Sequence, residues 1–167
     1  LLTLDEAKAV PPCLYARSTV GIPGTLLRPK GDGPCPAFLY CHAHGNAWEI
    51  GRKELLDGRP ALKCGAYGPV LAAQGFVVLC LDMPGHGDRL GEGTEGALAK
   101  SALWRGETLM GRMLGDLASG LDMLEADPGV DAGRIGAMGL SMGATHAYWL
   151  AALELRVAAV AHVCAFA

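Results

Sequence analysis

The chain has 167 residues, a length typical of one domain, and 51% of them are hydrophobic against 19% charged, so a sizeable core can form. Its net charge of −3 excludes the basic surface expected of a nucleic-acid-binding protein. No apolar run is long enough to span a bilayer, and the six cysteines are scattered without a C-x-x-C pair. We expect a single domain over residues 1–167, cytoplasmic, with reduced thiols, that binds neither nucleic acid nor membrane.

Hydrophobic runs bounded by Gly, Pro and polar residues predict the strands. Short runs without polar alternation are typical of strands buried on both faces. The first run is interrupted by Gly and Pro, which favours an edge strand because proline cannot donate to a sheet ladder. The predicted strands are Thr19–Pro29 at the edge, then Ala37–Cys41, Phe76–Leu81, Arg134–Leu140 and Val157–Val163.

Three segments between these strands have the features of helices. One is followed by a glycine, which is common at helix C-termini. The second has apolar residues at three- and four-residue spacing and ends before Asp-Pro-Gly. The third is rich in Ala, Leu and Met, which are strong helix formers. The predicted helices are Tyr67–Gln74, Leu109–Leu124 and Met142–Leu153, and the predicted loops without periodicity are Trp48–Pro60 and Arg89–Gly96.

The alternation of strands and helices predicts an α/β fold: a mostly parallel, twisted sheet with helices on both faces. In such sheets the reactive groups lie at the carboxyl ends of the strands. Three polar clusters directly follow predicted strands, namely 42–46, 82–88 and Ser141. We therefore expect these clusters to meet at one edge of the sheet.

Ser141 lies in Gly139-Leu-Ser-Met-Gly143, between a predicted strand and a predicted helix. This is the G-x-S-x-G pattern of a nucleophile elbow. Gly139 and Gly143 have no Cβ, so strand and helix can approach closely. The helix N-terminus would offer unpaired N–H groups to a developing oxyanion. In a chain with 24 glycines the pattern alone is weak, and the alternative is a glycine-rich turn whose serine only caps the helix.

Together the clusters resemble the α/β-hydrolase superfamily. The matching pieces are Leu39-Tyr-Cys-His-Ala-His-Gly45, Leu81-Asp-Met-Pro-Gly-His-Gly-Asp88 and Ile135-Gly-Ala-Met-Gly-Leu-Ser-Met-Gly143. The segment Asp127-Pro-Gly-Val-Asp-Ala-Gly-Arg-Ile-Gly136 is most similar to dienelactone-hydrolase-like and acetyl-xylan-esterase-like serine hydrolases. The resemblance covers about residues 19–166. It implies the α/β-hydrolase fold, esterase activity on a small carboxylic ester, and no cofactor or metal.

The resemblance also assigns roles. Ser141 would be the nucleophile, and the backbone N–H of Met142 would donate to the oxyanion. The second donor would come from the loop after Cys41, where the family's His-Gly-x pattern aligns in two ways. The donor is then the backbone N–H of His44 or of Asn46. We prefer His44, although alanine stands where the family has glycine in that alignment.

Other polar residues are expected to support the site. His42 would be a structural histidine that joins neighbouring loops. The loop after Leu81 would be held by Asp82, His86 and Asp88. Trp48 and Glu49 could line the substrate pocket or lie on a surface loop.

The remaining members of a catalytic triad are expected to lie outside this chain. In this fold the order is Ser, then acid, then His. After the nucleophile the only acid is Glu154, at the far end of the predicted helix and on the order of 20 Å from the elbow at ~1.5 Å per residue. His146 points to another side of that helix, and His162 precedes any further acid.

The chain ends also carry an expectation. It begins with Leu1 rather than methionine and stops inside an apolar run, which fits a domain incomplete at both termini. Without further strands Val157–Val163 would be an exposed apolar edge. We expect these 167 residues alone to associate and to have little esterase activity.

Two other functions stay open. In a metal-dependent hydrolase, imidazoles and carboxylates would bind zinc or a similar ion, and the serine would be structural. The familiar His-x-His-x-Asp-His pattern is not completed, because Asn46 and Ala47 occupy its last positions. The other alternative is a non-catalytic hydrolase-like module, and the oligomeric state is left open. The potential metal ligands are His42, His44, Asp82, His86 and Asp88.

Overall fold

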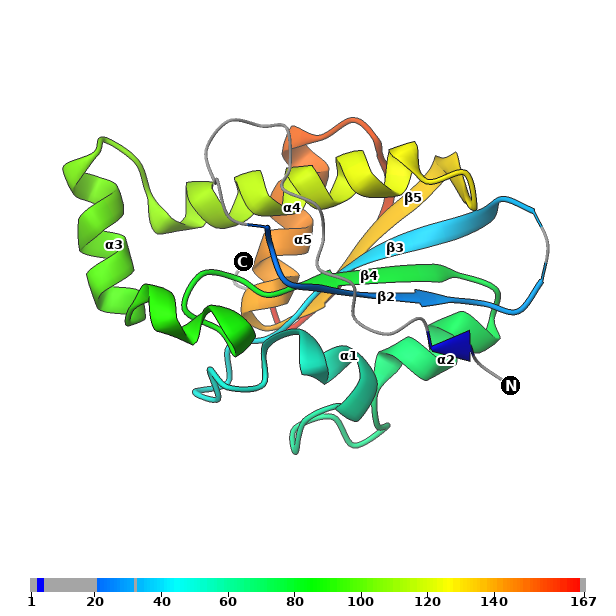
Figure 1. Cartoon of the computed structure of the whole chain (residues 1–167), viewed down its shortest axis with the longest axis horizontal. Coiled ribbons are helices and arrows are strands. Elements are labelled where there is room, and N and C mark those ends of the chain that lie inside the picture. Colours follow the sequence, from blue (N-terminus) through cyan, green and yellow to red (C-terminus); the bar gives the residue numbers. More distant parts are fainter. Residues whose placement is uncertain (1–2, 5–20, 32, 166–167) are drawn as a thin grey trace.

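The computed structural model describes residues 3–4, 21–31 and 33–165, and within these residues six strands form one sheet in the order β1-β2-β4-β3-β5-β6 (Figure 1). The pairs β4–β3, β3–β5 and β5–β6 are parallel, whereas β2 pairs antiparallel with both of its neighbours, β1 and β4. The predicted mostly parallel sheet is therefore confirmed. The strands are β1 (Thr3–Leu4), β2 (Gly24–Arg28), β3 (Cys35–Cys41), β4 (Val77–Leu81), β5 (Val130–Leu140) and β6 (Val157–Val163).

Two strand predictions need correction. The first predicted strand is present as β2, but it is not at the edge, because β1 pairs with it at Leu27 and Arg28. A strand of two residues, such as β1, is too short for a hydrophobic pattern that could predict it. The start of that prediction, residues 19–20, lies outside the described residues. β5 begins at Val130 rather than Arg134, because Val130 is buried and pairs with Cys35 of β3.

Helices fill the connections, and the three predicted ones are present. The two segments predicted to be loops are instead largely helical, which corrects the predictions for 48–60 and 89–96. The first is held by long-range contacts of its side chains, and the second leads into a helix capped by Thr94, whose Oγ1 accepts a bond from Ala97 N–H. The helices are η1 (Gly51–Lys53), α1 (Glu54–Asp57), α2 (Tyr67–Ala73), η2 (Gly87–Glu92), α3 (Glu95–Trp104), α4 (Leu109–Ala126) and α5 (Met142–Leu153).

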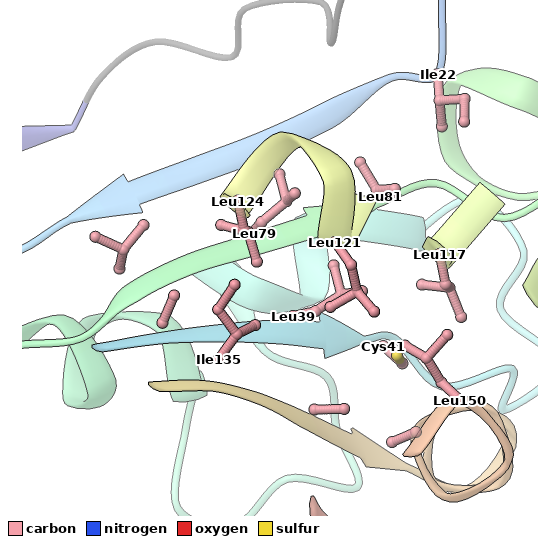
Figure 2. Close-up of a cluster of buried hydrophobic side chains, with 14 of the residues drawn as sticks. Ile22, Leu39, Cys41, Leu79, Leu81, Leu117, Leu121, Leu124, Ile135 and Leu150 are labelled. Carbon is pink, nitrogen blue, oxygen red and sulfur yellow. The ribbon is translucent and has the colours of Figure 1, made fainter. Parts of the chain in front are cut away.

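Each face of the sheet has its own apolar core. On one face Leu39 of β3 packs with Leu121 of α4 and Leu150 of α5 (Figure 2). On the other, Tyr40 of β3 packs with Leu55 of α1 and with residues of α2. Because successive strand residues point to opposite faces, both kinds of position must be apolar, which explains the unbroken hydrophobic runs. Helices on both faces, as predicted, are thereby confirmed.

None of the described helices combines the length and hydropathy that a membrane span needs. Five of the six cysteines lie in the described part of the chain and form no disulfide there, whereas Cys13 lies outside it.

Candidate functional site at the carboxyl edge of the sheet

The three polar clusters lie at the same edge of the sheet, as predicted. β3 ends at Cys41, which is level with Gly139 of β5, and Tyr40 is level with Cys80 of β4. Because these strands are parallel and in register, the segments that follow them emerge side by side. The first turn of α5 is packed directly against the end of β3, since a Cβ on Gly143 would overlap the carbonyl of Cys41.

Ser141 occupies a sharp turn between β5 and α5. Its φ is 57° and its ψ −118°, a conformation that non-glycine residues rarely adopt and that costs about 1–3 kcal/mol. The Ser141 N–H donates to the Val163 carbonyl at 2.9 Å, which ties the turn to β6. The side chain makes no capping hydrogen bond to α5, so the alternative of a helix-capping serine is not what this geometry shows.

The two glycines of the elbow permit two different close approaches. A Cβ on Gly139 would overlap the Gly143 carbonyl and would lie 2.8 Å from the Ala144 nitrogen, so this position lets β5 meet its own following helix. A Cβ on Gly143 would lie 2.6 Å from the His42 carbonyl oxygen. That position lets the helix meet the end of β3. The strand–turn–helix packing predicted from the motif is present.

The structure separates the two candidate oxyanion donors of the loop after β3. The Asn46 N–H is engaged, because it donates to Nδ1 of His44 at 3.1 Å. Neither the His44 N–H nor the Met142 N–H has an acceptor within the part of the chain that the structure describes. Of the two alignments, the one that uses His44 therefore leaves a free donor.

His42 is a structural link between two loops, as expected. Its Nδ1 donates to the Ala43 carbonyl at 3.0 Å, and its Nε2 accepts from the Met83 N–H at 3.1 Å. The imidazole is fully buried, and burial lowers its pKa to about 3, with smaller contributions from His86 and His146. Both ring nitrogens of the neutral ring are used, so this side chain has no free lone pair for catalysis.

The loop after β4 is held by carboxylates, also as expected. Asp82 accepts from the N–H of Arg52 at 2.7 Å and from that of Asp88 at 3.0 Å, and it also binds the Arg52 guanidinium. The same guanidinium binds Asp88 at 2.7 Å, which lowers the pKa of Asp88. The arginine that completes this network lies in η1, within a segment that sequence reasoning treated as a loop.

Two further histidines contain buried ring nitrogens without a partner among the described residues: Nε2 of His86 and Nδ1 of His146. His86 donates from Nδ1 to the Pro84 carbonyl at 3.1 Å, and its ring lies 5.2 Å from that of His42. Burial lowers the pKa of both, that of His146 to about 4. The unpaired nitrogen of His86 is a lone pair close to the loop of His44, whose ring lies 5.7 Å away.

The His44 side chain is held in place by two contacts. Its Nε2 lies 3.0 Å from a carboxylate oxygen of Glu95, and its ring meets that of Trp48 edge-on at 5.1 Å. Trp48 thus borders the loop after β3, whereas Glu49 is exposed beside a surface cleft that Lys53 also lines. These contacts place the predicted pocket residues around the loop but not in one enclosed cavity.

The ligand types for a metal site are present but are not arranged for one. In the described residues no group of three or more His, Cys, Asp or Glu side chains could hold an ion. The reason is visible in the contacts already given: both nitrogens of His42 and both oxygens of Asp82 are bound within the protein.

Of the late acid and histidine, only the acid lies away from the elbow turn, because His162 on β6 is level with Gly139 of β5. Glu154 follows the last residue of α5 and pairs with Arg156 at 2.9 Å. The 12-residue helix places it about 18 Å from the elbow along the helix axis, at ~1.5 Å per residue. His162 lies on the exposed strand β6, with its ring 6.3 Å from that of Tyr148.

Sequence reasoning missed the charged pair Glu54 and Arg59, which contacts the loop after β3 at Ala43. Both residues lie in the segment 48–60, which has no periodicity. The segment contains six charged residues, and nothing in their spacing singles out these two or indicates a partner for them.

A family model named "Dienelactone hydrolase family" matches residues 67–164. The protein named "Putative hydrolase YtaP" of Bacillus subtilis (strain 168) is 37% identical over 143 residues, which are 85% of this chain and 48% of that protein. The chain thus spans about half the length of this relative.

Solved structures share the fold. One named "putative acetyl xylan esterase" from Bacteroides fragilis has a TM-score of 0.74 at 16% identity, over 87% of this chain and 42% of that chain. The acetyl xylan esterase from Paenibacillus sp. R4 has a TM-score of 0.64 at 23% identity, over 87% and 45%. The predicted resemblance to dienelactone-hydrolase-like and acetyl-xylan-esterase-like proteins, and the predicted fold class, are confirmed.

Proposed function

Because the chain belongs to the dienelactone hydrolase family, we propose that the protein is a serine hydrolase that cleaves a small carboxylic ester and needs no cofactor. The observation that carries the proposal is the conformation of Ser141 between β5 and α5. Its backbone is strained, and its side chain makes no capping hydrogen bond to α5. Such strain persists only where the surrounding structure imposes it, and it is typical of functional positions.

In the proposed reaction the Oγ of Ser141 attacks the ester carbonyl and its proton passes to a base. The alcohol then leaves with a proton, and water hydrolyses the acyl-enzyme. The N–H groups of Met142 and His44 would stabilise the oxyanion. The triad acid and histidine are not assigned to any residue of this chain, because its one acid after Ser141, Glu154, lies at the far end of α5.

The nucleophile can be tested by labelling. A fluorophosphonate probe should react with the protein at its natural length, and Ser141→Ala should abolish both labelling and esterase turnover, with kcat falling by several orders of magnitude. The matched control is Ser101→Ala, on an exposed position of α3, which should keep both. Full labelling of the Ser141→Ala protein would refute the assignment.

The substrate class rests on the comparisons. Two of the similar folds are named as acetyl xylan esterases, so short acyl groups are the first substrates to try. We expect turnover of short-chain p-nitrophenyl esters that a chelator does not reduce. Hydrolysis that appears only with added metal would favour the metal-dependent alternative instead.

A further inference from the structure

We infer that Glu54 and Arg59 are positioning residues that hold the peptide between Ala43 and His44 so that the His44 N–H points at the developing oxyanion. The inference rests on the proposed function and concerns two side chains that lie in the segment after η1. Neither is placed against the substrate.

Glu54 binds the backbone N–H of Ala43, the residue that precedes His44. Its carboxylate is fully buried and accepts from the Ala43 N–H, at 3.2 Å through Oε1 and 3.1 Å through Oε2. It also accepts from the Tyr40 hydroxyl at 2.5 Å, and burial together with this carboxylate raises the pKa of Tyr40. The residue before His44 is therefore attached to a fixed anion on α1.

Arg59 holds the carbonyl groups that follow. Its Nη2 donates to the Ala43 oxygen at 2.8 Å, its Nη1 donates to the His44 oxygen at 3.2 Å, and its Nε pairs with Glu54. His42 also donates to the Ala43 oxygen. One guanidinium thus spans two successive carbonyls, a geometry that its planar arrangement of donors suits.

The direction of the His44 N–H follows from this arrangement. In a trans peptide the C=O and the N–H point to opposite sides. The Ala43 carbonyl belongs to the same peptide unit as the His44 N–H, so binding its oxygen to Arg59 aims that N–H away from Arg59. A bond to a cation at the carbonyl also polarises the peptide and strengthens its N–H as a donor.

The close fit of the loop on Arg59 is a second observation. Gly45 has a φ of +53°, and a Cβ there would overlap the guanidinium. The Arg59 side chain is 4% exposed and that of Glu54 is 0% exposed. Burying an ion pair is weakly stabilising at best, because desolvation of both charges offsets their attraction. Placing such a pair under a catalytic loop is better explained by orientation than by stability.

The test measures kcat, KM and the affinity of an alkyl boronic acid, which forms a tetrahedral adduct with a serine nucleophile. In the protein at its natural length, Glu54→Gln and Arg59→Gln should lower kcat about 10- to 100-fold, less than the ~100- to 1,000-fold expected when an oxyanion donor is removed. KM should change little, because the N–H is needed mainly in the transition state. Boronate affinity should fall with kcat.

Arg59→Lys is a more conservative variant, included in case the glutamine variants fail to fold. Lysine keeps the positive charge beside Glu54 but cannot bridge both carbonyls, so its kcat should lie between those of the wild type and Arg59→Gln. The matched control is Arg89→Gln, which breaks another buried ion network, with Glu92 and Asp116. It should lower the thermal midpoint but leave kcat and boronate affinity unchanged.

The outcomes separate the two ideas. If Arg59→Lys and Glu54→Gln fold and keep the wild-type kcat and boronate affinity, the positioning role is wrong while the proposed function stands. Equal losses in Arg89→Gln would also overturn it, because the effect would then be general destabilisation. If Ser141→Ala retains hydrolysis, the proposed function fails and this inference fails with it.

Discussion

Buried histidines near the elbow make the protein sensitive to acid. His42 and His146 have pKa values of about 3 and about 4, against a usual value of 6.5, because burial disfavours the charged ring. Unfolding exposes both rings and returns their pKa values to the usual 6.5. At any pH between the folded-state pKa and 6.5, the unfolded state therefore binds more protons than the folded state. The free energy of unfolding therefore falls as the pH drops below about 6.5, and the loss ends once the folded state is also protonated.

This slope gives a prediction for His146. At pH 5 a histidine shifted in this way lowers the free energy of unfolding by about 2 kcal/mol relative to neutral pH. Urea unfolding at pH 7 and pH 5 should show a smaller difference for His146→Gln than for the wild type, whatever its stability at pH 7. The control is His162→Gln, at an exposed position of β6, which should keep the wild-type difference. An unchanged difference in His146→Gln would mean that this ring is not held neutral.

At the scale of elements, the contact between α5 and the end of β3 depends on the missing Cβ of Gly143. Gly143→Ala would force the first turn of α5 away from the Cys41 and His42 carbonyls, which belong to backbone and cannot rotate aside. We expect the free energy of unfolding to fall by roughly 3 kcal/mol or more. Gly115→Ala is the matched control, because a Cβ there meets nothing within 4 Å on an exposed position of α4.

The two substitutions should act in opposite directions. Alanine is favoured over glycine in a helix interior by up to ~1 kcal/mol, so Gly115→Ala should stabilise. Urea denaturation followed by circular dichroism gives both values. If Gly143→Ala is as stable as the wild type, α5 does not need its close approach to β3.

Elements whose signals are local could be predicted from sequence. α5 and β6 begin and end where composition and hydrophobicity placed them, and α4 extends two residues beyond its predicted end. α1 could not be predicted, because its four residues are too few for a period and are held by tertiary contacts of Leu55 and Glu54. The two-residue β1 forms only because β2 offers it a partner.

The candidate site divides in the same way. The elbow could be predicted because Gly139, Ser141 and Gly143 form a local motif whose glycines relieve backbone clashes. Glu54 and Arg59 bind Ala43 in the loop after β3, which lies 11 and 16 residues earlier in the chain. No spacing in the sequence indicates such partners. Similarly, nothing in the sequence indicates the hydrogen bond that occupies the Asn46 N–H and supports the preference for His44.

At the scale of the whole molecule, the β6 edge of the sheet is apolar and carries no further strand in the part of the chain that the structure describes. Among the described strands β6 pairs only with β5, and every residue after Val157 in β6 is exposed. None of its side chains is a lysine, proline or acid, which are the residues that usually protect sheet edges. The exposed apolar surface continues onto α5, where Trp149 is 44% and Leu153 is 63% exposed.

We therefore predict that these 167 residues associate through β6 as their concentration rises. Val160 and Val163 are 42% and 41% exposed on this strand, and lysine at both positions should hinder pairing by charge repulsion between edges. Sedimentation velocity over a range of concentrations should show oligomers for the wild-type chain and mostly monomer for Val160→Lys/Val163→Lys. Leu103→Lys, at a 67% exposed position on α3, controls for added charge and should associate like the wild type. A wild-type chain that stays monomeric at the highest concentration reached would contradict the prediction, and equal relief by Leu103→Lys would show that net charge rather than the β6 edge governs association.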